Sequence, residues 1–126
     1  TNTKIIEQVG HGLVELIENG AIQSPEMKKL LTSYLEPMIA ANIDYLVLGC
    51  SHYPYLIPII KEIIPNHIQI IDSGEAVARQ TKAILEKNNL LNASNSEGNP
   101  VFYTNTNSAV LKKIIGYSKN VFEKEF

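Results

Sequence analysis

The sequence has one cysteine, one arginine and no tryptophan among its 126 residues. A single cysteine can form neither an internal disulfide nor a cysteine-rich zinc site, and no metal-binding motif is present. The net charge of −2 and the single Arg79 argue against nucleic acid as the main partner. No apolar run approaches the roughly 18 residues of a membrane helix, so we expect no membrane partner.

Signals for export are also absent. The chain begins with Thr1 and polar residues, without the basic and apolar stretches of a signal sequence. Together with the lack of disulfides, this favours a cytoplasmic protein. Because the first residue is not methionine, we expect either a processed chain or a piece of a longer one.

The hydrophobic residues that are present, 44% of the chain, are enough for a core. Short β-branched segments alternate with helical patterns, which predicts an α/β fold with a mostly parallel sheet and flanking helices. We expect strands at 4–9, 45–48, 68–71 and 101–104, and helices at 13–17, 25–41, 54–64, 74–87 and 108–117.

Three details of this pattern carry further expectations. The continuous apolar run 45–48 predicts a parallel strand that is covered on both faces. Pro37 lies inside a predicted helix, which it could kink or divide. The polar segment 88–100 reads as a surface loop, and the state of the tail 118–126 is left open.

The only cysteine lies where chemistry is expected in such a fold. Ligands of parallel sheets bind at the carboxyl ends of the strands, and Gly49, Cys50, Ser51 and His52 follow the predicted strand 45–48 directly. A glycine permits a sharp turn and close approach of a ligand, and an imidazole beside a thiol can exchange its proton. The alternative is that Cys50 is a small buried side chain and His52 a surface residue.

Other polar residues also follow predicted strands or helices. The segment 72–74 either contacts an anion at a helix N-terminus or, as we favour, caps that helix through Ser73 or Asp72. Glu18 could orient a histidine, although a solvated carboxylate is the more common reading. The role of His11 is open, and His67 is expected to be solvated.

At this point the motifs resemble a known family. The segment 46–54, Leu-Val-Leu-Gly-Cys-Ser-His-Tyr-Pro, closely resembles the second cysteine motif of bacterial glutamate racemases, with Ser51 where the family usually has threonine. The segments 72–78, 13–20 and 102–104 are similar, in the family's order, to a helix start, to a stretch that ends in an important glutamate and to the C-terminal strand.

The resemblance implies interconversion of L- and D-glutamate without a cofactor, which supplies D-glutamate for peptidoglycan and cell shape. It implies that Cys50 deprotonates L-glutamate, that His52 assists it and that Glu18 supports proton transfer. It also implies that Ser51 contacts the substrate, and it implies no metal. An aspartate racemase and a non-catalytic fragment are the alternatives.

Racemases of this family have two similar domains, and each gives one cysteine to a shared site. The Asp-Ser-Gly-x-Gly-Gly and Cys-Asn-Thr motifs of the first domain are absent here. We therefore expect one partial half of a two-domain fold, with 1–100 from the second domain and 101–126 returning to pack on the missing first domain. Alone, the chain is expected to be inactive, and a homodimer is a further expectation.

Overall fold

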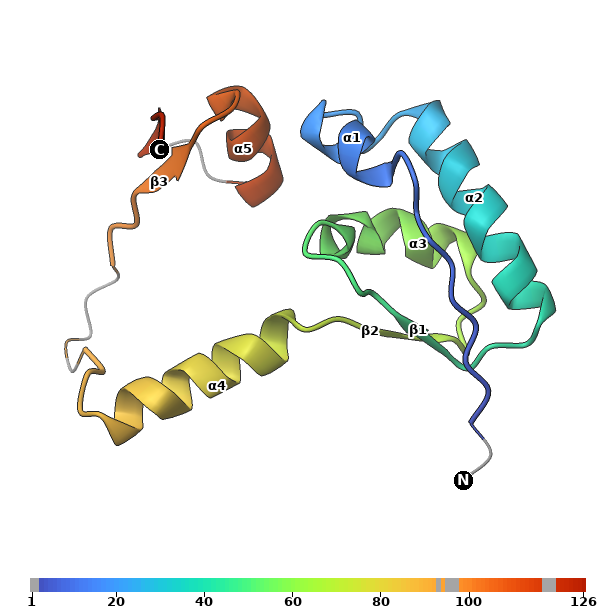
Figure 1. Cartoon of the computed structure of the whole chain (residues 1–126), viewed down its shortest axis with the longest axis horizontal. Helices are drawn as coiled ribbons and strands as arrows, with labels where there is room; N and C mark the ends of the chain where they lie inside the picture. The colour runs from blue at the N-terminus through green and yellow to red at the C-terminus, as the bar shows by residue number, and fades with distance from the viewer. Residues whose placement is uncertain (1–2, 93, 95–97, 117–119) are drawn as a thin grey trace. The chain divides into compact units, whose positions relative to one another are not determined.

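The computed structural model describes residues 3–92, 94, 98–116 and 120–126. The chain forms two compact units, unit 1 (Thr1–Asp72) and unit 2 (Ser73–Phe126). Each unit contains helices and one two-stranded parallel sheet, so the predicted α/β class with parallel strands is confirmed (Figure 1). The expected division at residue 100 is defined by the packing of 101–126 on a first domain outside this chain. It stays a prediction. Among the described residues, no helix combines the length and apolar character needed to cross a membrane.

Unit 1 begins with two helices close to their predicted positions. Helix α1 covers Leu13–Glu18 and helix α2 covers Pro25–Ala40. The start of α2 follows from its first residues, because the Ser24 side chain accepts a hydrogen bond from the backbone N–H of Met27 (3.1 Å). Pro37 lies inside α2, and the helix continues beyond it to Ala40.

This cap leads to a first prediction. Replacing Ser24 with alanine should lower the free energy of unfolding of unit 1 by about 1 kcal/mol, because one backbone N–H of the first turn loses its acceptor. Urea denaturation monitored by circular dichroism would measure the change. The matched control is Ser33→Ala, because the exposed Ser33 hydroxyl only donates to the Leu30 carbonyl within the same helix. Equal destabilisation by both variants would contradict the assigned role of Ser24.

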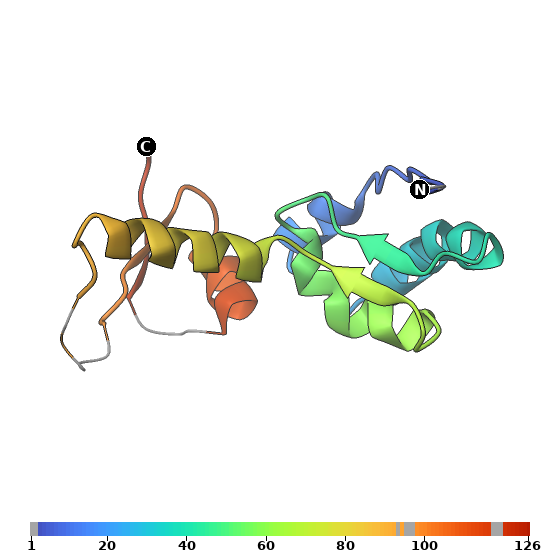
Figure 2. The same cartoon turned by 90° about the horizontal axis from the view of Figure 1, so that it is seen from below.

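The sheet of unit 1 is formed by strands β1 (Tyr45–Val47) and β2 (Gln69–Ile71). They are parallel, and Leu46 faces the core while Tyr45 and Val47 are 49% and 66% exposed. The expectation that both faces are covered is therefore wrong, because α2 and α3 (Ile57–Ile63) cover one face only (Figure 2). The core of this unit comprises Leu13, Ile17, Met27, Leu31, Leu35, Leu46, Leu48, Leu56, Ile59, Ile60, Ile64 and Ile68.

The strand predicted at 4–9 is not formed. Figure 1 shows this segment as an extended coil that leads into α1, and Ile5 and Val9 are 85% and 53% exposed. A β-branched sequence becomes a strand only when its backbone pairs with a neighbour, and the described pairing in unit 1 joins β1 to β2. The strand prediction at 4–9 is therefore wrong, because the pairing that a strand needs is absent from the described part of the chain.

The predicted helix 54–64 is formed in two parts. A 3-10 turn, η1 (Tyr53–Leu56), leads directly into α3. Pro54 and Pro58 lie in the first turns of η1 and α3, where a missing N–H costs least. The backbone N–H of Tyr53 donates to the Cys50 carbonyl at 3.2 Å, so this turn fixes the loop that holds the cysteine.

Unit 2 contains helix α4 (Gly74–Lys87), strand β3 (Phe102–Thr104), helix α5 (Ser108–Ile115) and strand β4 (Val121–Glu123). Strands β3 and β4 are parallel, so the tail that the sequence left open forms a strand. The predicted end of the last helix at Tyr117 lies outside the described residues, as do parts of the predicted loop 88–100.

The two helices of unit 2, α4 and α5, begin differently. The Asn107 side chain accepts from the Ala109 N–H (2.8 Å) at the start of α5, and the Glu123 carboxylate accepts from the Ser108 N–H (2.9 Å). Hydrogen bonds from the Ser108 backbone N–H and then from its side chain hold the pKa of Glu123 below its usual value. Ser73 occupies the N-cap position of α4 without a side-chain cap, so the predicted capping by Ser73 is wrong.

Candidate active site

The loop after β1 carries the cysteine at the carboxyl end of the sheet, as expected. The ladder extends one bond beyond the strand, from the Leu48 N–H to the Ile71 carbonyl (2.8 Å), and the loop then turns toward η1. Cys50 is half-buried. Gly49 does not use a positive φ, contrary to the expected role in a sharp turn, and a Cβ there would meet nothing within 4 Å. The space beside the Cα of Gly49 is therefore open.

His52 bridges the thiol and a carboxylate. Its Nδ1 lies 3.9 Å from Cys50 Sγ and 3.3 Å from Ser51 Oγ, while its Nε2 lies 3.1 Å from Glu18 Oε1. An ionised carboxylate only accepts, so Nε2 carries the proton and donates to Glu18. Nδ1 then faces the thiol, either as an acceptor for its proton or, once protonated, as a cation beside a thiolate.

Glu18 lies far from His52 in the sequence, 34 residues before it. It is the last residue of α1; Asn19 is the C-cap, and the chain turns away at Gly20 with φ 71°. The Glu18 side chain is 62% exposed, so the ion pair with His52 is worth at most about 1 kcal/mol. The contact is therefore better suited to orienting the imidazole than to stabilising the fold.

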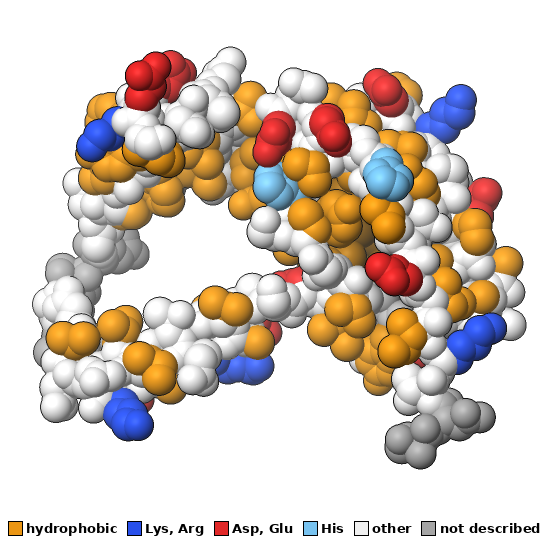
Figure 3. All heavy atoms as spheres, viewed as in Figure 1, with side chains coloured by type: hydrophobic (Ala, Val, Ile, Leu, Met, Phe, Trp, Pro, Cys, Tyr) orange, Lys and Arg blue, Asp and Glu red, His pale blue; other side chains and the backbone are white. Residues whose placement is uncertain are grey.

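The other three predicted residues, Ser51, His11 and His67, are exposed. Ser51 is exposed, and its contact with a substrate stays a prediction. His11 is exposed, and its backbone carbonyl accepts from Tyr34 (2.9 Å). His67 is exposed as expected. Figure 3 shows histidine side chains on one face beside carboxylates and hydrophobic groups.

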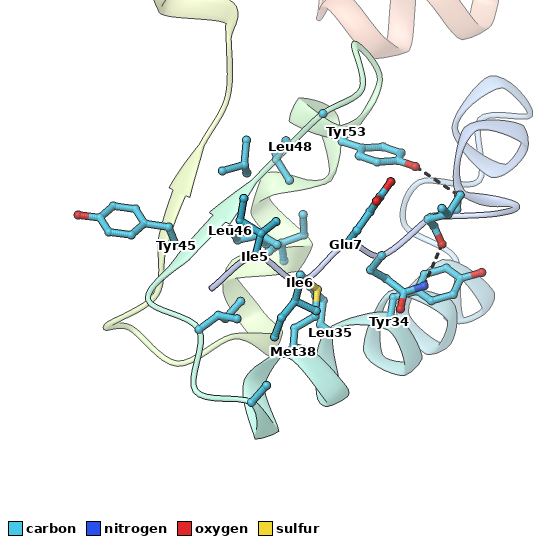
Figure 4. A pocket seen from close by; sticks show the side chains of 18 of the residues that line it. Ile5, Ile6, Glu7, Tyr34, Leu35, Met38, Tyr45, Leu46, Leu48 and Tyr53 are labelled. Carbon is cyan, nitrogen blue, oxygen red and sulfur yellow. Dashed lines mark hydrogen bonds between the residues drawn. The ribbon is translucent and has the colours of Figure 1, made fainter. Parts of the chain in front are cut away.

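Two tyrosines near the site were not identified from the sequence. The Tyr53 hydroxyl donates to the Gly10 carbonyl at 3.4 Å (Figure 4). The Tyr34 hydroxyl donates to the next carbonyl, that of His11, at 2.9 Å. Hydrogen bonds from a side chain to a distant backbone carbonyl leave no spacing or motif that sequence reading could detect.

Burial gives Tyr53 a distinct titration. Desolvation first, and then the nearby Cys50, raises the pKa of Tyr53 above the ordinary value of 10.0. The fold thus favours the neutral phenol. The resulting stabilisation is present below the unfolded-state pKa and is lost as the pH rises through the folded-state pKa.

A spectroscopic titration tests this. The difference in tyrosinate absorbance between the chain and its Tyr53→Phe variant should develop at a higher pH than the absorbance of the remaining tyrosines. Denaturation measured across the same pH range should show that the free energy of unfolding of the wild type, relative to that of Tyr53→Phe, falls as the pH rises. If Tyr53 titrated at or below the pH at which the remaining tyrosines titrate, the raised pKa of Tyr53 would be contradicted.

A cavity of about 1020 Å³ reaches the thiol loop from inside unit 1. Its walls are the segment 3–10, helix α2 and the segment 41–50, and Figure 4 shows Leu35 and Met38 opposite Leu46 and Leu48. Its lining is mostly apolar. Among the described residues, no three His, Cys, Asp or Glu side chains are grouped to hold a metal ion.

Sequence comparison gives relatives for most of the chain. No family model matches it. It is 43% identical over 114 residues to the glutamate racemase of Pseudomonas putida strain F1, and 44% identical over 91 residues to that of Pseudomonas syringae pathovar tomato DC3000. The first match covers 90% of this chain and 43% of the relative. The chain thus spans less than half the length of the curated relatives it matches.

Solved structures give the same result. The glutamate racemase RacE1 of Bacillus anthracis superposes with a TM-score of 0.69 at 27% identity, over 90% of this chain and 44% of that one. A glutamate racemase of Francisella tularensis, solved with D-glutamate, has the same TM-score at 24% identity and shares the fold. The chain is therefore a homologue of glutamate racemases in sequence and in fold, over somewhat less than half their length.

Proposed function

We propose that this chain, a homologue of glutamate racemases, carries one of the two proton-transfer cysteines of such an enzyme, which interconverts L- and D-glutamate. The observation that carries the proposal is the line of side chains from the Cys50 thiol through the His52 imidazole to the Glu18 carboxylate. The relatives described above are all named glutamate racemases, so aspartate is not favoured as the substrate.

In this proposal the Cys50 thiolate removes the α-proton of L-glutamate. His52 Nδ1 takes the thiol proton before the reaction or holds the thiolate as an ion pair, and Glu18 keeps Nε2–H directed away from the thiol. Ser51 contacts the substrate from the same loop. Inversion then needs a second acid on the opposite face of the α-carbon, and a second cysteine outside this chain supplies it.

No cofactor is needed in this scheme. An α-proton is weakly acidic, so the site must exclude water and stabilise the developing negative charge with fixed dipoles and donors. The open space beside Gly49, the residue before Cys50, is where we place part of the substrate. The proposed setting is cytoplasmic, with D-glutamate going to peptidoglycan, and the proposed assembly is a homodimer of the whole enzyme.

The test is a full-length chimaera in which this chain replaces the matching part of the Pseudomonas putida F1 relative. Incubated in D2O with L- or D-glutamate, the chimaera should exchange the α-proton for deuterium and form the other enantiomer, both measured by mass spectrometry and chiral chromatography. The isolated chain and the unmodified relative are the controls. A folded chimaera without exchange would support a non-catalytic fragment and overturn the proposal.

A further inference from the structure

We infer that the hydroxyls of Tyr34 and Tyr53 are positioning groups that hold the Glu18 carboxylate against His52, by fixing the loop that precedes α1. The inference rests on the proposed function, since it extends the same site. It assigns a role to two residues whose hydroxyls donate to backbone carbonyls and not to the imidazole or the carboxylate.

The two hydroxyls come from different parts of unit 1 and meet at adjacent peptide units. Tyr34 reaches from α2 and donates to the His11 carbonyl at 2.9 Å, and Tyr53 reaches from η1 and donates to the Gly10 carbonyl at 3.4 Å. Two consecutive carbonyls held from α2 and from η1 fix both the position and the orientation of the loop.

The loop is closely packed and has a special backbone conformation at this point. Gly12, the residue before α1, has φ 81°, a left-handed value that disfavours side chains other than glycine. A Cβ on Gly10 would lie 2.5 Å from the Tyr53 hydroxyl oxygen and 2.5 Å from Leu13 Cδ1. The backbone at Gly10 is therefore packed directly against Tyr53.

Helix α1 transmits this placement to Glu18. The helix has only six residues, too few to be stable alone, so its position depends on its packing and on the loop before it. Leu13 and Ile17 anchor its inner face in the core. Because the helix is a short rigid element, a shift of the loop displaces the carboxylate at the other end.

Tyr53 is also linked to the loop that carries Cys50 and His52. It follows His52 directly, and its backbone N–H donates to the Cys50 carbonyl at 3.2 Å. One residue thus joins the loop of the thiol and imidazole to the loop that starts the glutamate's helix. The titratable groups that act on it are Cys50, Tyr34 and Glu15.

The experiment measures thiol reactivity in the full chain, which needs no racemisation. Cys50 is the only cysteine, so its reaction rate with 5,5′-dithiobis(2-nitrobenzoate) reports this site alone. The rate would be measured over the range in which imidazoles and thiols titrate, for the wild type, Glu18→Gln and the double variant Tyr34→Phe with Tyr53→Phe. Tyr45→Phe, on the exposed face of β1, is the matched control.

We expect Glu18→Gln to slow the reaction at neutral pH by about three- to tenfold, because a neutral amide oxygen is a weaker acceptor for the His52 Nε2–H than a carboxylate. The double tyrosine variant should reproduce that slowing and the same pH profile, whereas Tyr45→Phe should keep the wild-type profile. Circular dichroism would verify that each variant is folded, and Tyr34→Phe alone replaces the double variant if that one unfolds.

A folded double variant with the wild-type pH profile would overturn the inference, and so would an unchanged profile in Glu18→Gln. Either result would leave the proposed racemase activity untouched, because that is measured separately in the chimaera. Conversely, an inactive chimaera with the expected thiol profiles would remove the proposed function while the tyrosine contacts kept their role in placing Glu18.

Discussion

Replacing Cys50 with alanine in the chimaera is expected to lower the rate of α-proton exchange from L-glutamate by about 10²- to 10⁴-fold, the range typical for loss of a positioned acid or base. The reason is that no other described side chain presents an acid–base sulfur at this edge of the sheet. Cys50→Ser should have a comparable effect, since an alcohol is a far weaker acid than a thiol and gives little of the ionised base.

The measurement is the initial rate of deuterium incorporation, followed separately from L- and D-glutamate. Ser33→Ala is a suitable control, because Ser33 lies exposed on α2 and bonds only within its own helix. Exchange at the wild-type rate in a folded Cys50→Ala chimaera would rule out the thiol as the base, whatever the similarity to known racemases.

A large loss of stability is expected for Leu56→Ala. The Leu56 side chain has no solvent exposure and lies at the end of η1, four residues after His52. Removing its buried methyl groups leaves a cavity, which costs about 2–5 kcal/mol for substitutions of this kind. Because small domains have little stability in reserve, most of unit 1 should unfold under conditions where the wild type is folded.

Chemical denaturation followed by NMR would resolve unit 1 from unit 2 through the methyl signals of its core residues. Val47→Ala is the control, because Val47 also loses methyl groups but is 66% exposed. The expected order is a large shift for Leu56→Ala and a shift within about 0.5 kcal/mol for Val47→Ala. Similar shifts in the two variants would show that the core of unit 1 does not include η1.

The sequence was most informative where local chemistry determines the structure. Helix α2 starts as predicted because a capping serine and a proline at the first helical position stand directly before its apolar face. Pro37 does not divide the helix, which was one of the two expectations, since α2 continues for three residues beyond it.

Predictions that depended on distant partners were less successful. The segment 4–9 has strand composition, yet a strand is defined by pairing, and pairing cannot be deduced from composition. The same limit applies to β1. Its apolar run correctly indicated a parallel strand, but whether Tyr45 and Val47 are covered depends on which other elements pack there.

The residues of the candidate site also differ in how far the sequence could identify them. Cys50 and His52 could be singled out because they follow a predicted strand, whereas the relevance of Glu18 came mainly from the family resemblance. The structure adds the distance of 3.1 Å between Glu18 and His52. Tyr34 and Tyr53 could not be found from sequence, because their hydroxyls contact backbone carbonyls 23 and 43 residues away.

Helix α4 gives the chain an uneven pattern of amide protection. None of its fourteen residues is buried, whereas α2 buries Met27, Leu31 and Leu35. A helix of this length without packing is only marginally stable in water. Its backbone amides should therefore exchange with solvent through frequent local opening, while those of α2 open only when unit 1 loses its core, so hydrogen exchange would separate the two helices by rate.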